Sequence, residues 1–270
     1  MSMHSLDKIF ENVELGIDGP LLSIRDLSVS FGGVEALSNV TFDVMNHEVV
    51  SVIGPNGAGK STLLNAVSGL VGGQVTGEIM MGNISISGKR PLAVANTGIG
   101  RSFQDPPLVE KETVLENVML GQHMRLNYSM VDQILRRKKV NKIEQEAIDN
   151  VQTLLEFMGL SSYANSVIGG LPYGVRKLVD ISRAVASGPR LLLLDEPTSG
   201  LDIEEQAIVG KILNELHSKT SVAILVVEHH MHVVRSVSDR VVGLESGRIV
   251  AIGEPDKVLA TEEFKLINGK

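Results

Sequence analysis

The sequence predicts an α/β fold in which helices cover a mostly parallel sheet and a helical subdomain interrupts the chain between two halves of that sheet. Short apolar runs at residues 49–53, 191–194 and 222–227 are typical of strands buried on both faces. Segments with apolar residues at helical spacing separate these runs, and such alternation favours a parallel sheet. From about residue 105 to residue 186 the spacing is mostly helical, which indicates an insertion.

The composition excludes several classes of protein. Hydrophobic residues make up 43% and charged residues 21% of the 270 residues, so we expect a folded globular chain rather than a disordered one. The chain has no cysteine, which excludes a disulfide scaffold, thiolate metal ligands and a cysteine nucleophile. A net charge of −7 argues against broad, non-specific binding to nucleic acid.

Neither a membrane span nor a secretory signal is expected. The apolar runs are far shorter than the roughly 18 residues that a spanning helix needs. The N-terminal segment carries acidic residues and lacks an apolar run, unlike a secretory signal. If the protein acts at a membrane, we expect another chain to supply the span.

The first half of the chain is expected to contain strands followed by a glycine-rich loop. Residues 1–20 have weak periodicity and are predicted to be a loose lead-in. Alternating apolar residues then predict a strand from Leu22 to Phe31 and another over residues 40–44. The buried strand at 49–53 leads into the glycine-rich segment. Apolar residues at 63, 64, 67, 70 and 71 predict a helix after that segment.

The second half is expected to return to the sheet after the insertion. The insertion has two helical stripes of apolar residues, at 114–119 and 143–158, with a basic run at 136–139 between them. The elements that follow are predicted as a strand at 191–194, a helix over 208–216, a strand at 222–227, a short helix over 231–238 and a hairpin of 241–244 with 248–252.

The glycine-rich segment matches the phosphate-binding pattern G-x-x-x-x-G-K-[ST] from Gly54 to Ser61. Glycines let successive backbone N–H groups point at one anion, and the dipole of the following helix adds positive potential. We expect Lys60 to reach the β- and γ-phosphates, Ser61 to ligate Mg²⁺ and Thr62 to bond the α-phosphate. The predicted nucleotide-binding residues of the loop are Gly54, Asn56, Gly57, Ala58, Gly59, Lys60, Ser61 and Thr62. The alternative, a tight turn that opens an ordinary helix, is disfavoured by the strand and the helix on either side.

A second chemical signal is the pair of acids that ends the apolar run at 191–194. Asp195 is predicted to hold a Mg²⁺-bound water, and Glu196 to orient and deprotonate the attacking water. The alternative is two solvated acids that open a turn. Lys60 and Asp195 are separated by 135 positions, which leaves room for a helical subdomain between the two halves of one site.

Five weaker motifs occur one after another along residues 21–255. They are Phe31 in Val29-Ser-Phe-Gly-Gly, Gln104 in Gly100-Arg-Ser-Phe-Gln, Gly174 in Leu171-Pro-Tyr-Gly-Val, Asp202 in Ser199-Gly-Leu-Asp, and His229 after Glu228. With the phosphate loop and the acidic pair, this order strongly resembles the ATP-binding subunits of ABC transporters. The resemblance implies a P-loop NTPase core of the ABC ATPase type with an N-terminal antiparallel β part. It implies a core of 21–104 and 188–255, a helical signature subdomain at 105–187, and terminal extensions at 1–20 and 256–270.

The resemblance also implies a role for each of these motif residues. Phe31 would stack on adenine, Gln104 would approach Mg²⁺ and the lytic water, and His229 would grip the γ-phosphate. Gly174 would begin the signature helix that faces a phosphate, and Asp202 would belong to the D-loop.

Taken singly, these motifs are also explained by ordinary structural roles. Phe31 alone is typical of a core aromatic, Gln104 of a loop amide and Asp202 of a helix N-cap. The histidines at 229, 230 and 232 also suggest a metal site, which the lack of cysteine and of a second ligand cluster disfavours.

The signature segment departs from the broad family pattern Leu-Ser-Gly-Gly-Gln. Pro172, Tyr173 and Val175 replace the serine, the first glycine and the glutamine. The Leu-Pro-Tyr-Gly form, the segments 98–104 and 113–118 and the long insertion are similar to the longer ATP-binding subunit of branched-chain amino acid importers. Val175 leaves two readings open: slower hydrolysis at the site that this segment completes, or drift in a loop that still positions a helix.

The function expected from the resemblance is ATP hydrolysis that powers an ABC transporter, most specifically an importer of branched-chain or related amino acids. ATP and Mg²⁺ are the implied cofactors. The implied partners are a second ATP-binding subunit in a homo- or heterodimer, transmembrane permease subunits and, indirectly, a substrate-binding protein, at the cytoplasmic face of the membrane. The alternatives are a soluble ABC ATPase that uses the basic run and Lys142 on nucleic acid or the ribosome, and an ATP-dependent assembly switch. A single cassette without a long coiled coil and with acidic charge disfavours the first alternative, and no nucleic-acid partner is expected.

Overall fold

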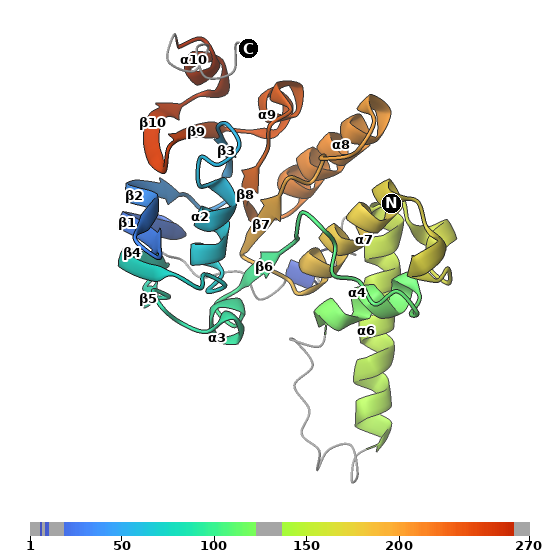
Figure 1. Cartoon of the computed structure of the whole chain (residues 1–270). Helices are drawn as coiled ribbons and strands as arrows, with labels where there is room; N and C mark the ends of the chain where they lie inside the picture. Colours follow the sequence, from blue (N-terminus) through green and yellow to red (C-terminus); the bar gives the residue numbers. More distant parts are fainter. Residues whose placement is uncertain (1–5, 7–8, 11–18, 123–136, 262–270) are drawn as a thin grey trace.

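Two sheets and a group of helices make up the computed structural model of the chain, which describes residues 6, 9–10, 19–122 and 137–261 (Figure 1). In Figure 1 the helices α4, α6 and α7 lie together on one side of the six-stranded sheet, away from the four-stranded sheet. No helix within those described ranges is both long and apolar enough to cross a membrane.

The four-stranded sheet is antiparallel, as expected for the N-terminal β part. Its strands are β1 Leu22–Phe31, β2 Val34–Val44, β4 Gln74–Met81 and β5 Ile84–Ser85, in the order β2-β1-β4-β5. The sequence did not predict β4, because most of its first five residues are exposed and carry no clear apolar alternation. Gly77 also interrupts it with a φ of 89°. Pairing with the buried strand β1 holds β4 in place instead.

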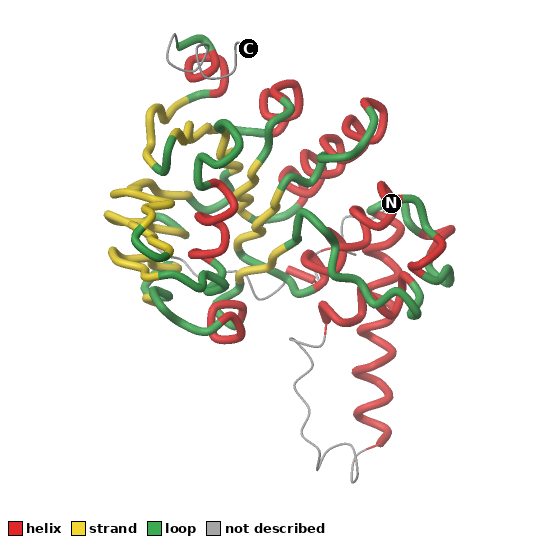
Figure 2. The backbone as a smooth tube through the Cα atoms, in the orientation of Figure 1, coloured by secondary structure: helices red, strands yellow, loops and turns green. Residues whose placement is uncertain are grey.

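The six-stranded sheet is parallel except at one edge. Its strands are β3 Val49–Ile53, β6 Ile99–Arg101, β7 Leu191–Asp195, β8 Ala223–Val227, β9 Arg240–Glu245 and β10 Arg248–Gly253, in the order β10-β9-β3-β8-β7-β6. Only β10 runs antiparallel to its neighbour. This arrangement confirms the predicted α/β class with a mostly parallel sheet. Figure 2 shows helices beside these strands and the strands of the four-stranded sheet on the other side of the molecule from α4, α6 and α7.

Most helices occupy the positions that the apolar spacing predicts, with one shorter than expected, whereas the helices at Pro91–Ala95 and Pro255–Leu259 were not predicted. The helices are α2 Lys60–Val67, α3 Pro91–Ala95, α4 Val114–Gln122, α6 Arg137–Phe157, α7 Tyr173–Ala186, α8 Ile203–Lys219, α9 Met231–Val237 and α10 Pro255–Leu259, with 3-10 turns at Ser161–Tyr163 and Ile168–Gly170. Helix α2 ends at Val67 rather than near residue 71. Gly69, with a φ of 71°, turns the chain out of the helix.

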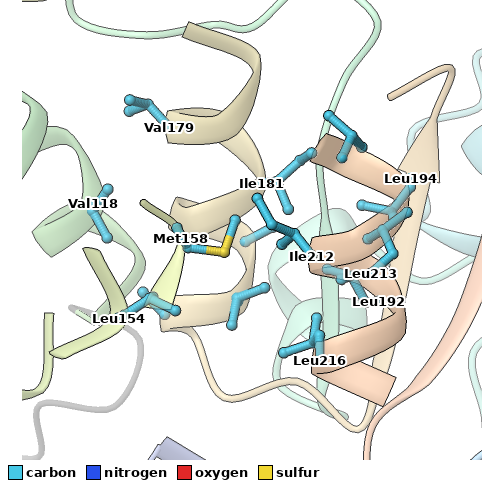
Figure 3. Packing of buried hydrophobic residues seen from close by; sticks show 14 of the residues in the cluster. Val118, Leu154, Met158, Val179, Ile181, Leu192, Leu194, Ile212, Leu213 and Leu216 are labelled. Carbon is cyan, nitrogen blue, oxygen red and sulfur yellow. The ribbon is translucent and has the colours of Figure 1, made fainter. Parts of the chain in front are cut away.

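Successive residues of the central strands belong to two different hydrophobic clusters, one on each face of the sheet. Leu191 and Leu193 face a cluster shared with α2 and the antiparallel sheet. Leu192 and Leu194 face a cluster that includes α4, α6, α7 and α8. Figure 3 shows this second cluster, where Met158 and Ile181 meet side chains of α8. The sheet is thus buried on both faces, which explains why its strands are continuous apolar runs. The same cluster crosses the expected boundary at residue 187, so the domain limits stay a prediction.

One prediction about the ends of the chain is wrong in part. Among residues 1–20, expected as a loose lead-in, the described residues Leu6, Ile9 and Phe10 are buried in the cluster of the helical subdomain. Their spacing of three and four matches one face of a helix, a signal too short to stand out among charged neighbours. At the other end, Val258 and Leu259 of α10 belong to a small buried cluster with Ile53, and the expected extension at 256–270 stays a prediction.

Candidate functional site

The phosphate loop and the acidic pair meet at one edge of the central sheet. The loop follows β3 and the acids end β7, and parallel strands present their carboxyl ends at the same edge. The Ser61 hydroxyl donates a hydrogen bond of 3.3 Å to Asp195 Oδ1, across 134 positions of sequence. A cleft of about 900 Å³ opens beside this contact. It is lined by Ala36, Gly54, Pro55, Asn56, Gly57, Gly59, Lys60, Ser61, Thr62, Gln104, Glu196, Ser199 and His229.

The loop needs glycine at defined positions. Gly59, with a φ of 98°, is the N-cap of α2, and a Cβ there would lie 2.6 Å from the carbonyl oxygen of Ala36. A Cβ on Gly54 would lie 2.1 Å from the carbonyl oxygen of Leu244. Helix α2 has no acidic residue in its first turn and no side-chain cap at its N-cap. Its first N–H groups therefore suit an anion in the cleft.

Lys60 is only 6% exposed although it lines the cleft. Its Nζ donates hydrogen bonds to the carbonyl oxygens of Gly54 at 2.7 Å and Pro55 at 3.0 Å. Burial lowers the pKa of Lys60, and the nearby carboxylates of Glu196 and Asp195 oppose that shift. The ammonium is thus held inside the loop, where it supplies positive charge to the phosphate cradle.

Arg101 forms an ion pair with Asp195 that the sequence reasoning missed. Its Nη2 lies 3.3 Å from Asp195 Oδ2, and both side chains are 7% exposed. The sequence motif that contains Arg101 pointed to Gln104 instead, and a single arginine in a short strand carries no signal of its own. Burial lowers the pKa of Arg101, opposed by Asp195. The guanidinium nevertheless stays charged at neutral pH.

The donor set in the cleft fits a magnesium ion. The Ser61 hydroxyl and the Asp195 carboxylate lie in contact, and Gln104 lines the same cleft. Hydroxyl, carboxylate and amide oxygens are the ligands that Mg²⁺ prefers. The roles of these three residues toward a metal stay predictions.

Glu196 and His229 face one another in the cleft. His229 Nδ1 lies 3.9 Å from Glu196 Oε2, and the Glu196 side chain is mostly buried. Glu196 has a φ of 48°, an uncommon conformation for a residue other than glycine. Such strain persists only where surrounding contacts hold it, and it is frequent at functional sites.

A buried carboxylate fixes the segment that carries His229. Glu228 is fully buried and accepts hydrogen bonds from the backbone N–H groups of His229 at 2.7 Å and His230 at 3.0 Å. Its other carboxylate oxygen accepts a hydrogen bond from the hydroxyl of Thr198. Glu228, His229 and His230 lie close enough to hold a metal ion, as the histidine run suggested. Because these hydrogen bonds already engage both carboxylate oxygens, the geometry favours a structural role for Glu228.

Four predicted nucleotide-binding residues lie outside the lining of the cleft: Phe31, Ala58, Gly174 and Asp202. Ala58 is buried beneath the loop. Phe31 is 43% exposed and lines a separate hollow with Gly72 and Gly73.

Asp202 and Gly174 meet the same glutamate. Asp202 caps α8 in a capping box with Glu205, so its helix N-cap role is present in the single chain. The Glu205 carboxylate packs over Gly174 in the first turn of α7. Among the basic residues considered for nucleic acid, the side chains at 136–139 lie outside the described part of the chain, and Lys142 lies 3.7 Å from Glu146.

Comparison with known proteins gives one consistent family. A family model described as ABC transporter matches residues 37–199. The chain is 34% identical to the high-affinity branched-chain amino acid transport ATP-binding protein LivG of Escherichia coli K12, over 88% of this chain and 93% of that protein. It is 35% identical to the phosphonates import ATP-binding protein PhnC 2 of a Synechococcus species, over 88% of this chain and 87% of that protein.

Solved structures agree with these relatives. The ADP conformation of MJ1267, an ATP-binding cassette of an ABC transporter, matches with a TM-score of 0.79 and 31% identity, over 93% of this chain and 98% of that chain. A dimeric post-hydrolysis state of the cassette MJ0796 bound to ADP and Pi matches with a TM-score of 0.71 and 26% identity, over 87% of this chain and 98% of that chain.

Proposed function

The chain belongs to the ABC transporter family of ATP-binding subunits and is an ATPase of an importer, and on that premise we propose that it powers the uptake of branched-chain or related amino acids. The similarity to LivG over 88% of this chain supports the proposal. The Leu-Pro-Tyr-Gly form of the signature segment points the same way. Relatives named for phosphonate and methionine import match at similar identity, so the substrate is the part that needs an experiment.

The geometry of the cleft supports hydrolysis by placement and charge stabilisation. The loop N–H groups and Lys60 would hold the β- and γ-phosphates, and His229 would contact the γ-phosphate from the opposite side. Glu196 would orient the attacking water and accept its proton. Ser61, Asp195 and Gln104 would hold Mg²⁺, which when bound neutralises charge on the phosphates.

We further propose that the working unit contains two ATP-binding subunits. The MJ0796 cassette is dimeric in its ADP-bound structure. Gly174 and Asp202 lie outside the lining of this chain's own cleft, as expected if they complete the site of a second subunit. ATP shared between the subunits would close the dimer, and loss of the γ-phosphate link would open it. The second subunit is either another copy of this chain or a different ATP-binding chain.

The remaining partners follow from transport. Transmembrane permease subunits would carry the amino acid, with a substrate-binding protein acting indirectly, and the chain would sit at the cytoplasmic face of the membrane. Among the described residues, no observation on the basic segment or on the cleft favours the nucleic-acid or assembly alternatives over transport.

Two substitutions test the cleft. Lys60→Ala should lose most affinity for ATP, with Lys211→Ala on the exposed side of α8 as control. Glu196→Gln should still bind ATP, hydrolyse it at least about a hundredfold more slowly and trap a dimer. Glu78→Gln, an exposed carboxyl on β4, is the matched control. Wild-type hydrolysis by Glu196→Gln would remove Glu196 from its proposed role.

The substrate is tested on the transporter reconstituted in vesicles with its permeases and binding protein. ATP hydrolysis should rise when the binding protein carries leucine, isoleucine or valine. Stimulation by a phosphonate or by methionine alone would refute branched-chain uptake while leaving the ATPase intact.

A further inference from the structure

Helix α7 sends a lysine into the interior beneath the cleft. Lys177 is 1% exposed and ranks among the largest fully buried side chains of the described residues. Its Nζ donates hydrogen bonds to two backbone carbonyl oxygens, that of Gln104 at 2.5 Å and that of Glu196 at 3.1 Å. These two residues are the ones proposed to approach the lytic water, and they come from segments far apart in the chain.

These contacts join the helical subdomain to the core. Lys177 belongs to α7, the helix of the signature segment, whereas Glu196 directly follows the central strand β7. Gln104 lies where the chain leaves the core for the helices. The Tyr173 hydroxyl, one turn before Lys177, also donates to the Gln104 carbonyl oxygen at 3.2 Å. The first turns of α7 therefore hold the start of the inserted segment through two donors.

The contact with Glu196 controls a strained residue. The N–H of Glu196 donates to the carbonyl oxygen of Val227 at 3.0 Å, and its own carbonyl oxygen accepts from Lys177. Both peptide groups that flank the left-handed Cα are thereby fixed, and their orientation sets the direction in which the Glu196 side chain leaves the backbone. The N–H of Ser199 also donates to this carbonyl oxygen, at 3.1 Å, so loss of the ammonium removes one of its two donors.

A buried, charged lysine is uncommon at a position whose role is purely structural. Burial lowers the pKa of Lys177, and the carboxylates of Asp180, Asp105, Asp195 and Glu196 oppose that shift. A buried charge is costly unless it is paired and hydrogen-bonded, and an apolar side chain of similar volume commonly stabilises a fold as well or better. A lysine that bridges two carbonyls of the catalytic segments therefore suggests a role in the reaction.

We propose that Lys177 is a positioning residue for ATP hydrolysis, whose ammonium couples the position of the helical subdomain to the orientation of Glu196 and the Gln104 segment. When α7 is docked on the core, the bridge holds the Glu196 carboxylate toward the cleft. A movement of α7 away from the core breaks the bridge and removes this restraint from both segments. The proposal rests on the proposed function, since it assigns Lys177 to the reaction of Glu196.

The test uses the full-length chain in the assembled transporter. Lys177→Met removes the donor at similar side-chain length and should lower kcat for ATP hydrolysis by about tenfold to a hundredfold, the range for a misplaced catalytic group. The KM for ATP should stay within about twofold, because Lys177 lies outside the lining of the cleft. Lys177→Arg keeps a buried cation with several donors and should recover most of kcat.

The matched control is Arg176→Met, which removes a neighbouring cation of the same helix that pairs instead with Glu110. Its kcat should match that of the wild type. If Lys177→Met does not fold, Lys177→Leu replaces it, and the loss of the donor should lower kcat in the same way without changing KM.

Three results would overturn the inference. They are a wild-type kcat in the variant without the ammonium, a loss in Lys177→Arg as large as in Lys177→Met, and a rise in KM that accounts for the whole effect. These results differ from a failure of the proposed function, in which the wild-type chain itself does not hydrolyse ATP or Glu196→Gln hydrolyses it normally.

Discussion

Replacing Arg101 with methionine tests the buried ion pair between Arg101 and Asp195. The guanidinium lies against the Asp195 carboxylate at 3.3 Å, with both side chains 7% exposed. It also donates to the carbonyl oxygen of Leu64 at 3.1 Å and to Asn65 Oδ1 at 2.8 Å. Methionine fills similar volume without a donor, so the variant isolates charge and hydrogen bonding from packing.

The expected magnitude follows from burial. Removing one partner of a buried ion pair costs about 3–5 kcal/mol, because the other charge is left uncompensated. Asp195 keeps one hydrogen bond from Ser61 and lies beside the open cleft, so water can relieve part of that cost. We therefore expect Arg101→Met to lower the free energy of unfolding by about 3 kcal/mol.

A double-mutant cycle measures the pair directly. The free energy of unfolding in urea is compared for the wild type, Arg101→Met, Asp195→Asn and the double variant. Because the double variant leaves no buried charge unpaired, it should be more stable than Arg101→Met alone, with a coupling energy above about 1 kcal/mol. A cost below about 1 kcal/mol for Arg101→Met, as for an exposed pair, would refute the reasoning.

Three further changes have direct readouts. Gly54→Ala places a Cβ 2.1 Å from the carbonyl oxygen of Leu244, so the loop must shift and ATP affinity should fall at least about tenfold by titration; unchanged affinity would contradict the close approach. Burial lowers the pKa of His217 below 6.5, and His47 stacked on it lowers the pKa further, so this histidine stabilises the fold above its unfolded pKa and loses that contribution as the pH falls. From about pH 7.5 to about pH 5.5 the wild type should therefore lose more stability in urea than His217→Phe, and parallel losses would exclude this effect. Leu216→Ala empties a fully buried position and should cost about 2–5 kcal/mol in the same assay; a cost under about 1 kcal/mol would mean that the core collapses around it.

The sequence predicted most of the central sheet and most of the residues that line the cleft, but not Ala36, Pro55 or Ser199. The strands β3, β7 and β8 are continuous apolar runs because both of their faces are covered, and this pattern is readable without a structure. No strand or helix was predicted in the region from β4 to β6. That region consists of short elements whose backbone is held by pairing with strands elsewhere in the chain. Its local pattern therefore carries little information.

By itself the sequence determined the chemistry available to this protein, since a glycine-rich turn, a lysine and two acids at the end of an apolar run encode local conformation and reactive groups within a few residues. Only the tertiary structure decided which buried charges serve that chemistry. Arg101 meets Asp195 across 94 positions, and Lys177 meets Gln104 across 73. The reason is physical: the cost of burying a charge depends on the partners that surround it, and those partners become neighbours only when the chain folds.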